Sequence, residues 1–428
     1  MKINEEQKQT MNKNLDNLAQ QIICACTQKN QIIPVVGYNA TGKTNLLQII
    51  KRHLSFEQEW NLLDLDQQPF SMQKNQKQQL SSWNHFVLNL IDAKAFTEKF
   101  YKEQALQAFV QIFFVNDKNL AYRHTNEQMN LKEQILHDWL NYQSLEKILF
   151  IDLPSGQRFL KTLELLAQWV DKLHQLKLFN NNLKHLITLE SPEQFGHIAL
   201  VNKIAKVLYQ INQMQVNIVL TTHSPELVHQ FYRSNRLNDA QTIKTLKLLE
   251  KDAFFIADFT KSSQIGILNS RDLKMLVQAL FDENVFLVEG LKEYELINQL
   301  MDHDFPEHFY NVYDCQGKAV VKKRLAFLLH FRINHSCFVL FDRDLKNQSP
   351  EQKQRSQHYL NAVKQLYQQQ QLEPYYYQVE DNIEDFLHQA GAKNDLHLVH
   401  YDYIKKLPHY GDLKMALNIF LNYQKLKI

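Results

Sequence analysis

Glycine is scarce in this sequence: its 428 residues include nine glycines, and cysteine is rarer still at four. Four cysteines are too few for a disulfide scaffold, and the Cys24-Ala25-Cys26 spacing does not match that of a zinc site. We therefore expect the cysteines to be small buried side chains in a reducing cytoplasm.

One-sided charge and long hydrophobic runs are also missing. Lysine and arginine number 48 against 46 aspartates and glutamates, so whole-chain charge gives no argument for a nucleic-acid partner. No apolar run is long enough to span a bilayer, and the polar segment 1–20 lacks the core of a signal peptide. With 44% hydrophobic residues, the sequence predicts a globular, cytoplasmic protein of two or three domains without a membrane partner.

Because glycine tolerates positive φ and close backbone approach, each glycine in such a chain is informative. Gly37 and Gly42 bracket a loop that follows an apolar run, and Lys43 and Thr44 then open a helical pattern. This is the phosphate-binding loop G-x-x-x-x-G-K-[ST], whose amides cradle phosphate while the lysine reaches the β- and γ-phosphates and the threonine holds Mg²⁺. The sequence predicts ATP and Mg²⁺ binding here, with Asn39 as a further contact within the loop.

Three more segments with candidate polar residues follow the loop. A buried strand, "HLITL", ends at Glu190 and Ser191, and a β-branched strand, "VNIVL", runs into His223. Between them and the loop, a tripeptide opens a long amphipathic helix; its residues are Ser155, Gly156 and Gln157. Taken singly, each has a plain explanation, such as an N-cap for the serine and a structural role for the histidine.

In this order the segments resemble the motifs of ABC-type ATPases. The tripeptide then resembles the signature loop, which in that family binds the γ-phosphate held by the other subunit, so the resemblance implies a homodimer formed through the ATPase domain. It also implies that Glu190 orients Mg²⁺ through water and that His223 contacts the γ-phosphate. Ser191 stands where the family places the glutamate that polarises the attacking water, and serine cannot act as a base unaided. Glu193 is the alternative carboxylate.

Two departures from that family leave questions open. About 30 residues precede the phosphate-binding loop, and they have a helical pattern in place of the strand pair that stacks on adenine. Base recognition therefore stays open. Residues 55–145 form a predicted helical insertion, rich in glutamine and lysine at 67–79, which could be a dimerisation arm or a substrate surface.

Past residue 265 the pattern changes to β-α-β-α-β, with acids at the ends of two apolar strands. The strand 285–288 ends at Glu289, and a later strand ends at Asp342 and Asp344. Ligands of open α/β sheets bind at the carboxyl ends of the strands. Carboxylates converging there would repel one another without a divalent metal, and such a metal can activate water and stabilise the leaving oxygen of a phosphodiester.

This half resembles the TOPRIM domain, a Rossmann-like fold with Glu-Gly at one strand end and Asp-x-Asp at the next. The resemblance implies catalysis by Glu289, Asp342 and Asp344 with Mg²⁺ or Mn²⁺. The metal ligands that we predict are Glu289, Glu293, Asp342, Asp344 and Glu384. Lys318 and Lys414 could steady phosphate charge, although ordinary surface lysines explain both equally well.

Together the motifs predict an α/β chain with an ABC-type ATPase domain at 1–265 and a TOPRIM domain at 266–428. This architecture resembles the OLD-family nucleases and related anti-phage defence systems such as Gabija and PARIS. It implies an ATP-regulated endonuclease that cuts DNA in anti-phage defence or DNA repair, together with a defence-system partner protein. The alternatives are a tRNA nuclease of PARIS type and a non-catalytic RecF/SMC-like scaffold. If Ser191 slows hydrolysis, bound ATP would act as a state signal and not as fuel.

Overall fold

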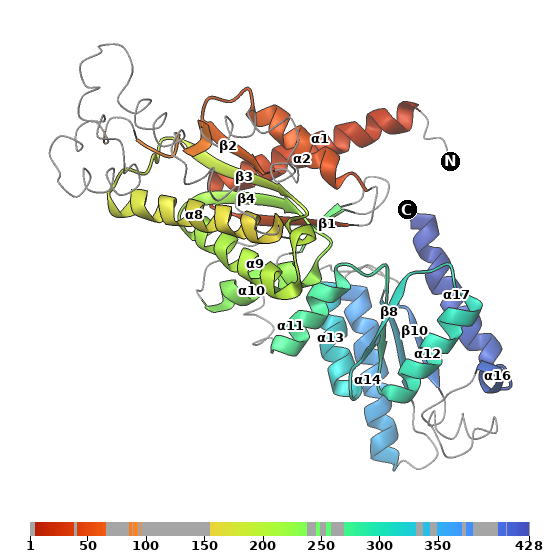
Figure 1. Ribbon diagram of the computed structural model, residues 1–428. Coiled ribbons are helices and arrows are strands. Elements are labelled where there is room, and N and C mark those ends of the chain that lie inside the picture. The colour runs from red at the N-terminus through yellow and green to blue at the C-terminus, as the bar shows by residue number, and fades with distance from the viewer. Residues whose placement is uncertain are drawn as a thin grey trace, which may run out of the picture. The chain divides into compact units, whose positions relative to one another are not determined.

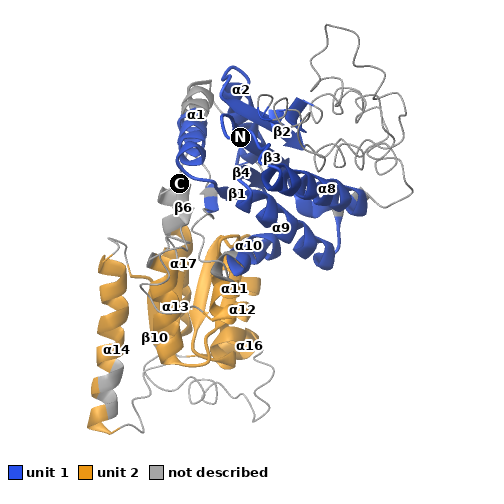
Figure 2. Ribbon diagram, turned by 90° about the vertical axis from the view of Figure 1, so that its left-hand side faces the viewer, with its two compact units in different colours: residues 1–248 blue, residues 249–428 orange. Residues whose placement is uncertain are grey.

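The structure is a computed structural model, and it divides the chain into two compact units, residues 1–248 and 249–428 (Figure 2). It describes residues 5–37, 41–65, 85–87, 89–92, 95, 155–237, 245–248, 254–257, 269–330, 337–342, 349–369, 374–379, 401–407 and 409–427. Most of the predicted insertion 55–145 and the predicted boundary at 265 lie outside these residues. Among the helices described, none has both the length and the apolar character needed to cross a membrane.

The first unit is built on a sheet whose strands run in the order β2-β3-β4-β1-β5-β6. Strand β1 pairs in parallel with β4 and β5, and β3 pairs in parallel with β2 and β4. Figure 1 shows α1 and α2 on one side of this sheet and α8, α9 and α10 on the other. Because both faces are covered, the central strands β1, β3 and β4 are buried along almost their whole length and do not alternate between buried and exposed residues. The edge strand β6 lies just past the boundary between the units.

The elements of this sheet and its helices follow the predicted alternation of strand and helix. They are α1 (Glu5–Gln28), β1 (Ile32–Gly37), α2 (Lys43–Leu54), β2 (Trp60–Leu65), α8 (Ser155–Gln175), β3 (Lys184–Glu190), the 3₁₀ helix η3 (Pro192–Phe195), α9 (Ile198–Gln213), β4 (Val216–Thr221), α10 (Pro225–Leu237), β5 (Thr245–Leu248) and β6 (Phe254–Ala257). The predicted helix before the phosphate-binding loop is confirmed as α1, which packs against α2.

The second unit has a four-stranded parallel sheet in the order β10-β9-β7-β8. Its elements are α11 (Ser270–Ala279), β7 (Asn284–Val288), α12 (Leu291–Asp304), β8 (Tyr310–Asp314), α13 (Lys318–His330), β9 (Cys337–Asp342), α14 (Pro350–Gln369), β10 (Tyr376–Val379), α16 (Tyr401–Ile404) and α17 (Tyr410–Lys427). Helices α11, α13 and α14 cover one face, and α12, α16 and α17 cover the other (Figure 1). The predicted β-α-β-α-β order is confirmed, and so is the mixed α/β fold class.

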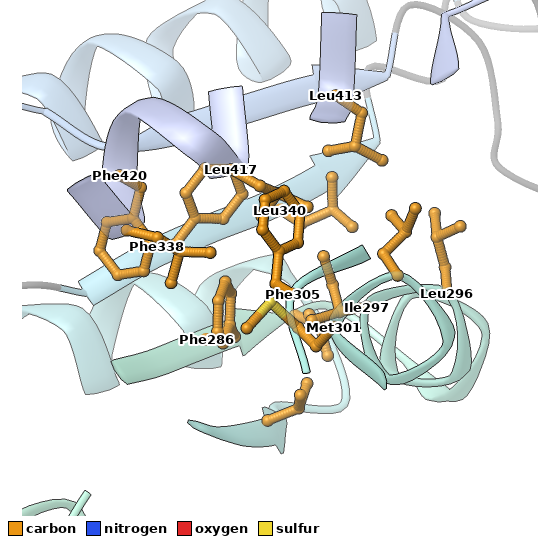
Figure 3. Close-up of a cluster of buried hydrophobic side chains, with 14 of the residues drawn as sticks. Phe286, Leu296, Ile297, Met301, Phe305, Phe338, Leu340, Leu413, Leu417 and Phe420 are labelled. Atoms are coloured by element: carbon orange, nitrogen blue, oxygen red, sulfur yellow. The ribbon is translucent and has the colours of Figure 1, made fainter. Parts of the chain in front are cut away.

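A buried aromatic cluster fixes α17 on this sheet (Figure 3). The Phe420 ring of α17 lies 5.4 Å from both Phe286 of β7 and Phe338 of β9, and 5.3 Å from Tyr375, measured between ring centroids. Aromatic rings at this separation add to the free energy of burial itself. The far C-terminal helix therefore belongs to the core of the second unit.

Candidate nucleotide site and acidic sheet edge

The phosphate-binding loop needs both of its glycines. Gly37 has φ 152° and Gly42 has φ 93°, in the region that favours glycine over residues with a side chain. A Cβ on Gly37 would lie 2.6 Å from the carbonyl oxygen of Leu248, so β5 could not approach β1 as closely. Gly42 directly precedes α2 as its N-cap. Asn39 lies outside the described residues and stays a prediction.

Lys43 opens α2 with its side chain folded back over the loop. Its Nζ donates to the Gly37 carbonyl at 2.7 Å, and the residue is 7% exposed. Burial lowers the pKa of Lys43 to about 8, and the negative charge of Glu193 partly opposes that shift. A cation held at a helix N-terminus is a site for an anion such as phosphate.

Thr44 and Glu190 meet at the same edge of the sheet. The Thr44 hydroxyl on α2 donates a short hydrogen bond to Glu190 Oε1 at the end of β3. A hydroxyl and a carboxylate are oxygen ligands of the kind that Mg²⁺ prefers in proteins. The residues predicted to serve Mg²⁺ are thus brought together, and their chemistry fits that ion.

Ser191, the next residue, is held by its backbone and is buried. Its backbone is left-handed, with φ 46° and ψ 58°, and its amide donates to the Thr221 carbonyl at 2.9 Å. The residue is 5% exposed. A buried hydroxyl on a strained turn offers no carboxylate to an attacking water.

Glu193, in η3, instead lies with Lys43 and His223. Its Oε1 accepts from the His223 amide at 2.6 Å. Burial raises the pKa of Glu193, while hydrogen bonds from His223 and Thr222 and the charge of Lys43 oppose that rise. Partial burial lowers the pKa of His223, and the positive charge of Lys43 lowers it further. The structure therefore places Glu193, which the sequence offered only as an alternative carboxylate, beside two predicted site residues, Lys43 and His223.

The tripeptide predicted to be a signature loop opens α8, as expected from the helical pattern. Gly156 is buried and Gln157 is exposed, and α8 packs against η3 and α9. The side chain of Ser155 lies outside the described residues. Contact of these three residues with a nucleotide on a second subunit stays a prediction.

In the second unit the strands that carry the acids are neighbours. Val288 of β7 pairs with Leu340 of β9 on one side and with Asp314 of β8 on the other. Glu289 directly follows β7, and Asp342 is the last residue of β9. Their backbones therefore share the carboxyl edge of a parallel sheet, which is where the sequence placed them.

The surroundings of Glu289 are partly basic. Lys318 Nζ, at the start of α13, lies 3.7 Å from Glu289 Oε2, and the two side chains are 23% and 25% exposed. The turn before α13 also contacts this acid, because the Gly317 amide donates to the Glu289 carbonyl at 2.8 Å. Lys318 is thus placed where charge on a phosphate near Glu289 could be paired.

Glu293, a predicted metal ligand, has contacts within α12 that can be described. Glu293 is 5% exposed, and its Oε2 accepts from the Gly290 amide at 3.0 Å, which satisfies the N-cap amide of α12. Its role as a metal ligand stays a prediction. Glu384, Asp344 and the side chain of Asp342 lie outside the described residues.

Within the described ranges, no group of three His, Cys, Asp or Glu side chains is close enough to hold a metal ion. The acids at this edge nevertheless suit a hard divalent cation, since carboxylate oxygens are its preferred ligands. Sequence reasoning missed one acid at this edge, Asp314, whose Oδ1 accepts from the Gln316 amide at 2.8 Å. Its position at a strand end just before the glycine turn could have pointed to it.

The hypothesis that Lys414 steadies phosphate charge was wrong. Lys414 Nζ forms an ion pair with Asp304 at 2.5 Å, and Asp304 also accepts from the hydroxyls of Tyr401 and Tyr410. Asp304 ends the 14-residue helix α12, whose start lies at the acidic edge, so about 20 Å of helix separates the two. Lys414 therefore joins α12 to α16 and α17 and is part of the packing.

Comparison with known proteins identifies one part of the chain. Residues 280–344 match the family described as "Overcoming lysogenization defect protein-like, TOPRIM domain". The second unit therefore contains an OLD-like TOPRIM domain, which includes the strands β7, β8 and β9. No curated protein matches the sequence significantly.

One solved structure with some similarity is a metal-chelate-type ABC transporter in an inward-facing conformation. It is 17% identical, the match covers 54% of this chain and 74% of that chain, and the TM-score is 0.27. A TM-score this low does not establish a shared fold. The candidate nucleotide site of the first unit is therefore argued from the contacts of Lys43, Thr44 and Glu190 alone.

Proposed function

We propose that the chain is an ATP-regulated, metal-dependent endonuclease of OLD type that cuts DNA phosphodiesters. One observation carries this proposal: the OLD-like TOPRIM match spans Glu289 and Asp342, which lie at the ends of neighbouring parallel strands. Carboxylates at such an edge bind Mg²⁺ or Mn²⁺, and these ions supply activated water and stabilise the leaving oxygen. We also propose that the chain acts in anti-phage defence or DNA repair. A partner protein of the same defence system is part of this proposal.

The chain's own groups have distinct roles in this proposal. Five acids hold the cation: Glu289, Glu293, Asp342, Asp344 and Glu384. Lys318, 3.7 Å from Glu289, pairs with a non-bridging oxygen of the phosphate and orients it against the acids. The substrate backbone follows the carboxyl edge of the sheet, because the ligands of open α/β sheets bind there.

The proposed ATPase domain, residues 1–265, binds ATP and dimerises. Lys43 and the loop amides hold the phosphates, Thr44 holds Mg²⁺, and Glu190 orients the ion through water. His223 contacts the γ-phosphate, and the loop that opens α8 contacts the nucleotide of the partner subunit. The ATP-bound dimer keeps the TOPRIM domain, residues 266–428, in one state, and loss or turnover of the nucleotide changes that state.

The test is a cleavage assay on plasmid DNA and, separately, on total tRNA, with Mg²⁺ or Mn²⁺ and with or without ATP. The protein is compared with Asp342→Ala/Asp344→Ala and with a matched control, Asp402→Ala/Asp412→Ala, which removes two exposed aspartates of the same unit. We expect metal-dependent DNA cleavage that the first double variant abolishes and the control retains. Cleavage of tRNA alone would make the substrate RNA, and no cleavage under any condition would favour the scaffold alternative.

A further inference from the structure

The proposed nucleotide site has a serine at position 191, but two carboxylates lie close to it in sequence: Glu190, the last residue of β3, and Glu193, in η3. Of these, Glu190 accepts the hydrogen bond of Thr44 and, in the proposed site, orients Mg²⁺ through water. Ser191 is 5% exposed and its amide is turned toward Thr221. A carboxylate for water therefore has to come from Glu193, if this loop provides one.

Glu193 lies among the groups that would surround a γ-phosphate. Its Oε1 is fixed by the His223 amide at 2.6 Å, and its carboxylate interacts electrostatically with Lys43. Lys43 begins α2, Glu193 lies in η3, and His223 follows β4. Since β4 lies between β1 and β3 in the sheet, three separate elements bring the Lys43 side chain, the Glu193 carboxylate and the His223 backbone amide to the carboxyl edge of the sheet.

We propose that Glu193 is the catalytic carboxylate that activates water for ATP hydrolysis in this chain, in place of a glutamate at position 191. This inference rests on the proposed binding of ATP at Lys43 and Thr44. A water molecule attacks the γ-phosphorus while one of its protons moves to a carboxylate oxygen of Glu193. The new bond joins the water oxygen to phosphorus, and the bond from phosphorus to the β–γ bridging oxygen breaks. ADP leaves with that electron pair, and Glu193 then releases its proton to solvent.

The hydrogen bond to His223 makes one substitution informative. In Glu193→Gln the amide oxygen can still accept from the His223 amide, so the anchor between η3 and the loop after β4 is kept. The amide cannot take a proton from water at neutral pH. The variant therefore separates the chemical function of Glu193 from its structural one.

The experiment measures ATP turnover of the full chain and, by calorimetry, its affinity for the non-hydrolysable analogue AMP-PNP with Mg²⁺. For Glu193→Gln we expect turnover to fall at least about 100-fold, the range for loss of a general base, with AMP-PNP affinity and melting temperature unchanged. The matched control is Glu226→Gln, which alters a glutamate of α10 bonded to Gln230 at 2.6 Å, and it should keep full turnover. Adding Ser191→Glu to Glu193→Gln should restore part of the turnover.

The outcomes separate this inference from the proposed function. Unchanged turnover in Glu193→Gln overturns the inference, and so does the absence of turnover in the unmodified chain. A parallel loss of AMP-PNP affinity also overturns it, because Glu193 would then act through the position of Lys43 or His223. The proposed ATP binding fails only if AMP-PNP does not bind the unmodified chain, or binds Lys43→Ala equally well.

Discussion

The Thr44 hydroxyl donates to Glu190 across 146 positions of sequence, and the order of the sheet makes this contact possible. Thr44 follows β1 and Glu190 ends β3, two strands that are both neighbours of β4. Parallel strands carry their ends to one edge, so residues of separate motifs meet there. The contact marks the place where Mg²⁺ would join the nucleotide to the sheet.

Removal of the Thr44 hydroxyl should weaken the Mg²⁺-dependent part of nucleotide binding. For Thr44→Ala we expect the AMP-PNP affinity measured with Mg²⁺ to fall about tenfold or more, a typical effect of losing a group that supports a metal. The affinity measured in EDTA should not change. Thr27→Ala is the control, since the Thr27 hydroxyl bonds the Cys24 carbonyl at 2.7 Å within α1. An equal loss with and without Mg²⁺ would show that Thr44 does not serve the metal.

Lys318 should oppose cation binding at Glu289 while assisting cleavage. Its Nζ is 3.7 Å from Glu289 Oε2, a separation at which charges interact by about 1 kcal/mol in water and about 4 kcal/mol near a protein surface. We expect Lys318→Met to bind Mn²⁺ several-fold more tightly, as measured by electron paramagnetic resonance of free and bound Mn²⁺, and to cleave more slowly. Lys322→Met, one turn further along α13, should change neither quantity. Weaker Mn²⁺ binding in Lys318→Met would contradict this electrostatic account.

The packing of α17 predicts that truncation of two adjacent residues to alanine will lower the free energy of unfolding by different amounts. Phe420 is fully buried among Phe286, Phe338 and Tyr375, whereas Ile419 is 55% exposed. We expect Phe420→Ala to lower the free energy of unfolding of the second unit by about 3–5 kcal/mol, and Ile419→Ala to change it by about 0.5 kcal/mol or less. Hydrogen exchange of the β7 and β9 amides, followed by mass spectrometry, reports this unit alone. Equal effects of the two substitutions would mean that α17 does not belong to this core.

Some of this arrangement could be predicted because the informative residues lie close together in sequence. Gly42, Lys43 and Thr44 combine a positive φ, a phosphate ligand and a helix start in adjacent positions, so the local pattern determines both chemistry and structure. Glu289 could be predicted for the same reason, because the apolar strand β7 and the carboxylate that follows it are contiguous in sequence. Alternation of strands and helices then predicts parallel sheets, whose carboxyl edges collect these residues.

Other contacts depend on which elements pack together, and no local pattern contains that information. The bond between Glu193 and the His223 amide requires β3 and β4 to be neighbours. The sequence allowed Lys414 to contact phosphate because its ion-pair partner, Asp304, lies 110 residues earlier in the chain. The pairing of the half-exposed Lys414 with the buried Asp304 becomes visible only when α12 and α17 are placed together.

His185 is another residue whose environment the sequence did not reveal. Its Nε2 donates to the Asn180 carbonyl at 2.8 Å, and its Nδ1 accepts from Asn61 Nδ2 at 3.1 Å. These roles define a neutral ring with its proton on Nε2. A second proton would place two donors face to face in a site where His185 is 1% exposed. Burial therefore lowers the pKa of His185 to about 4, although the bond to Asn180 opposes that shift.

The first unit should accordingly begin to lose stability at a pH above the range in which carboxylates usually become protonated. The unfolded chain takes up the His185 proton near pH 6.5 and the folded chain only near pH 4, so the free energy of unfolding falls as the pH drops through this window. The full loss is about 3 kcal/mol. All four tryptophans lie within residues 1–248, so their fluorescence during urea unfolding reports this unit. His185→Gln should flatten the pH dependence between pH 6.5 and 4, whereas His197→Asn, which keeps a side-chain acceptor at the start of α9, should not. A slope that persists in His185→Gln would assign the acid sensitivity to other groups.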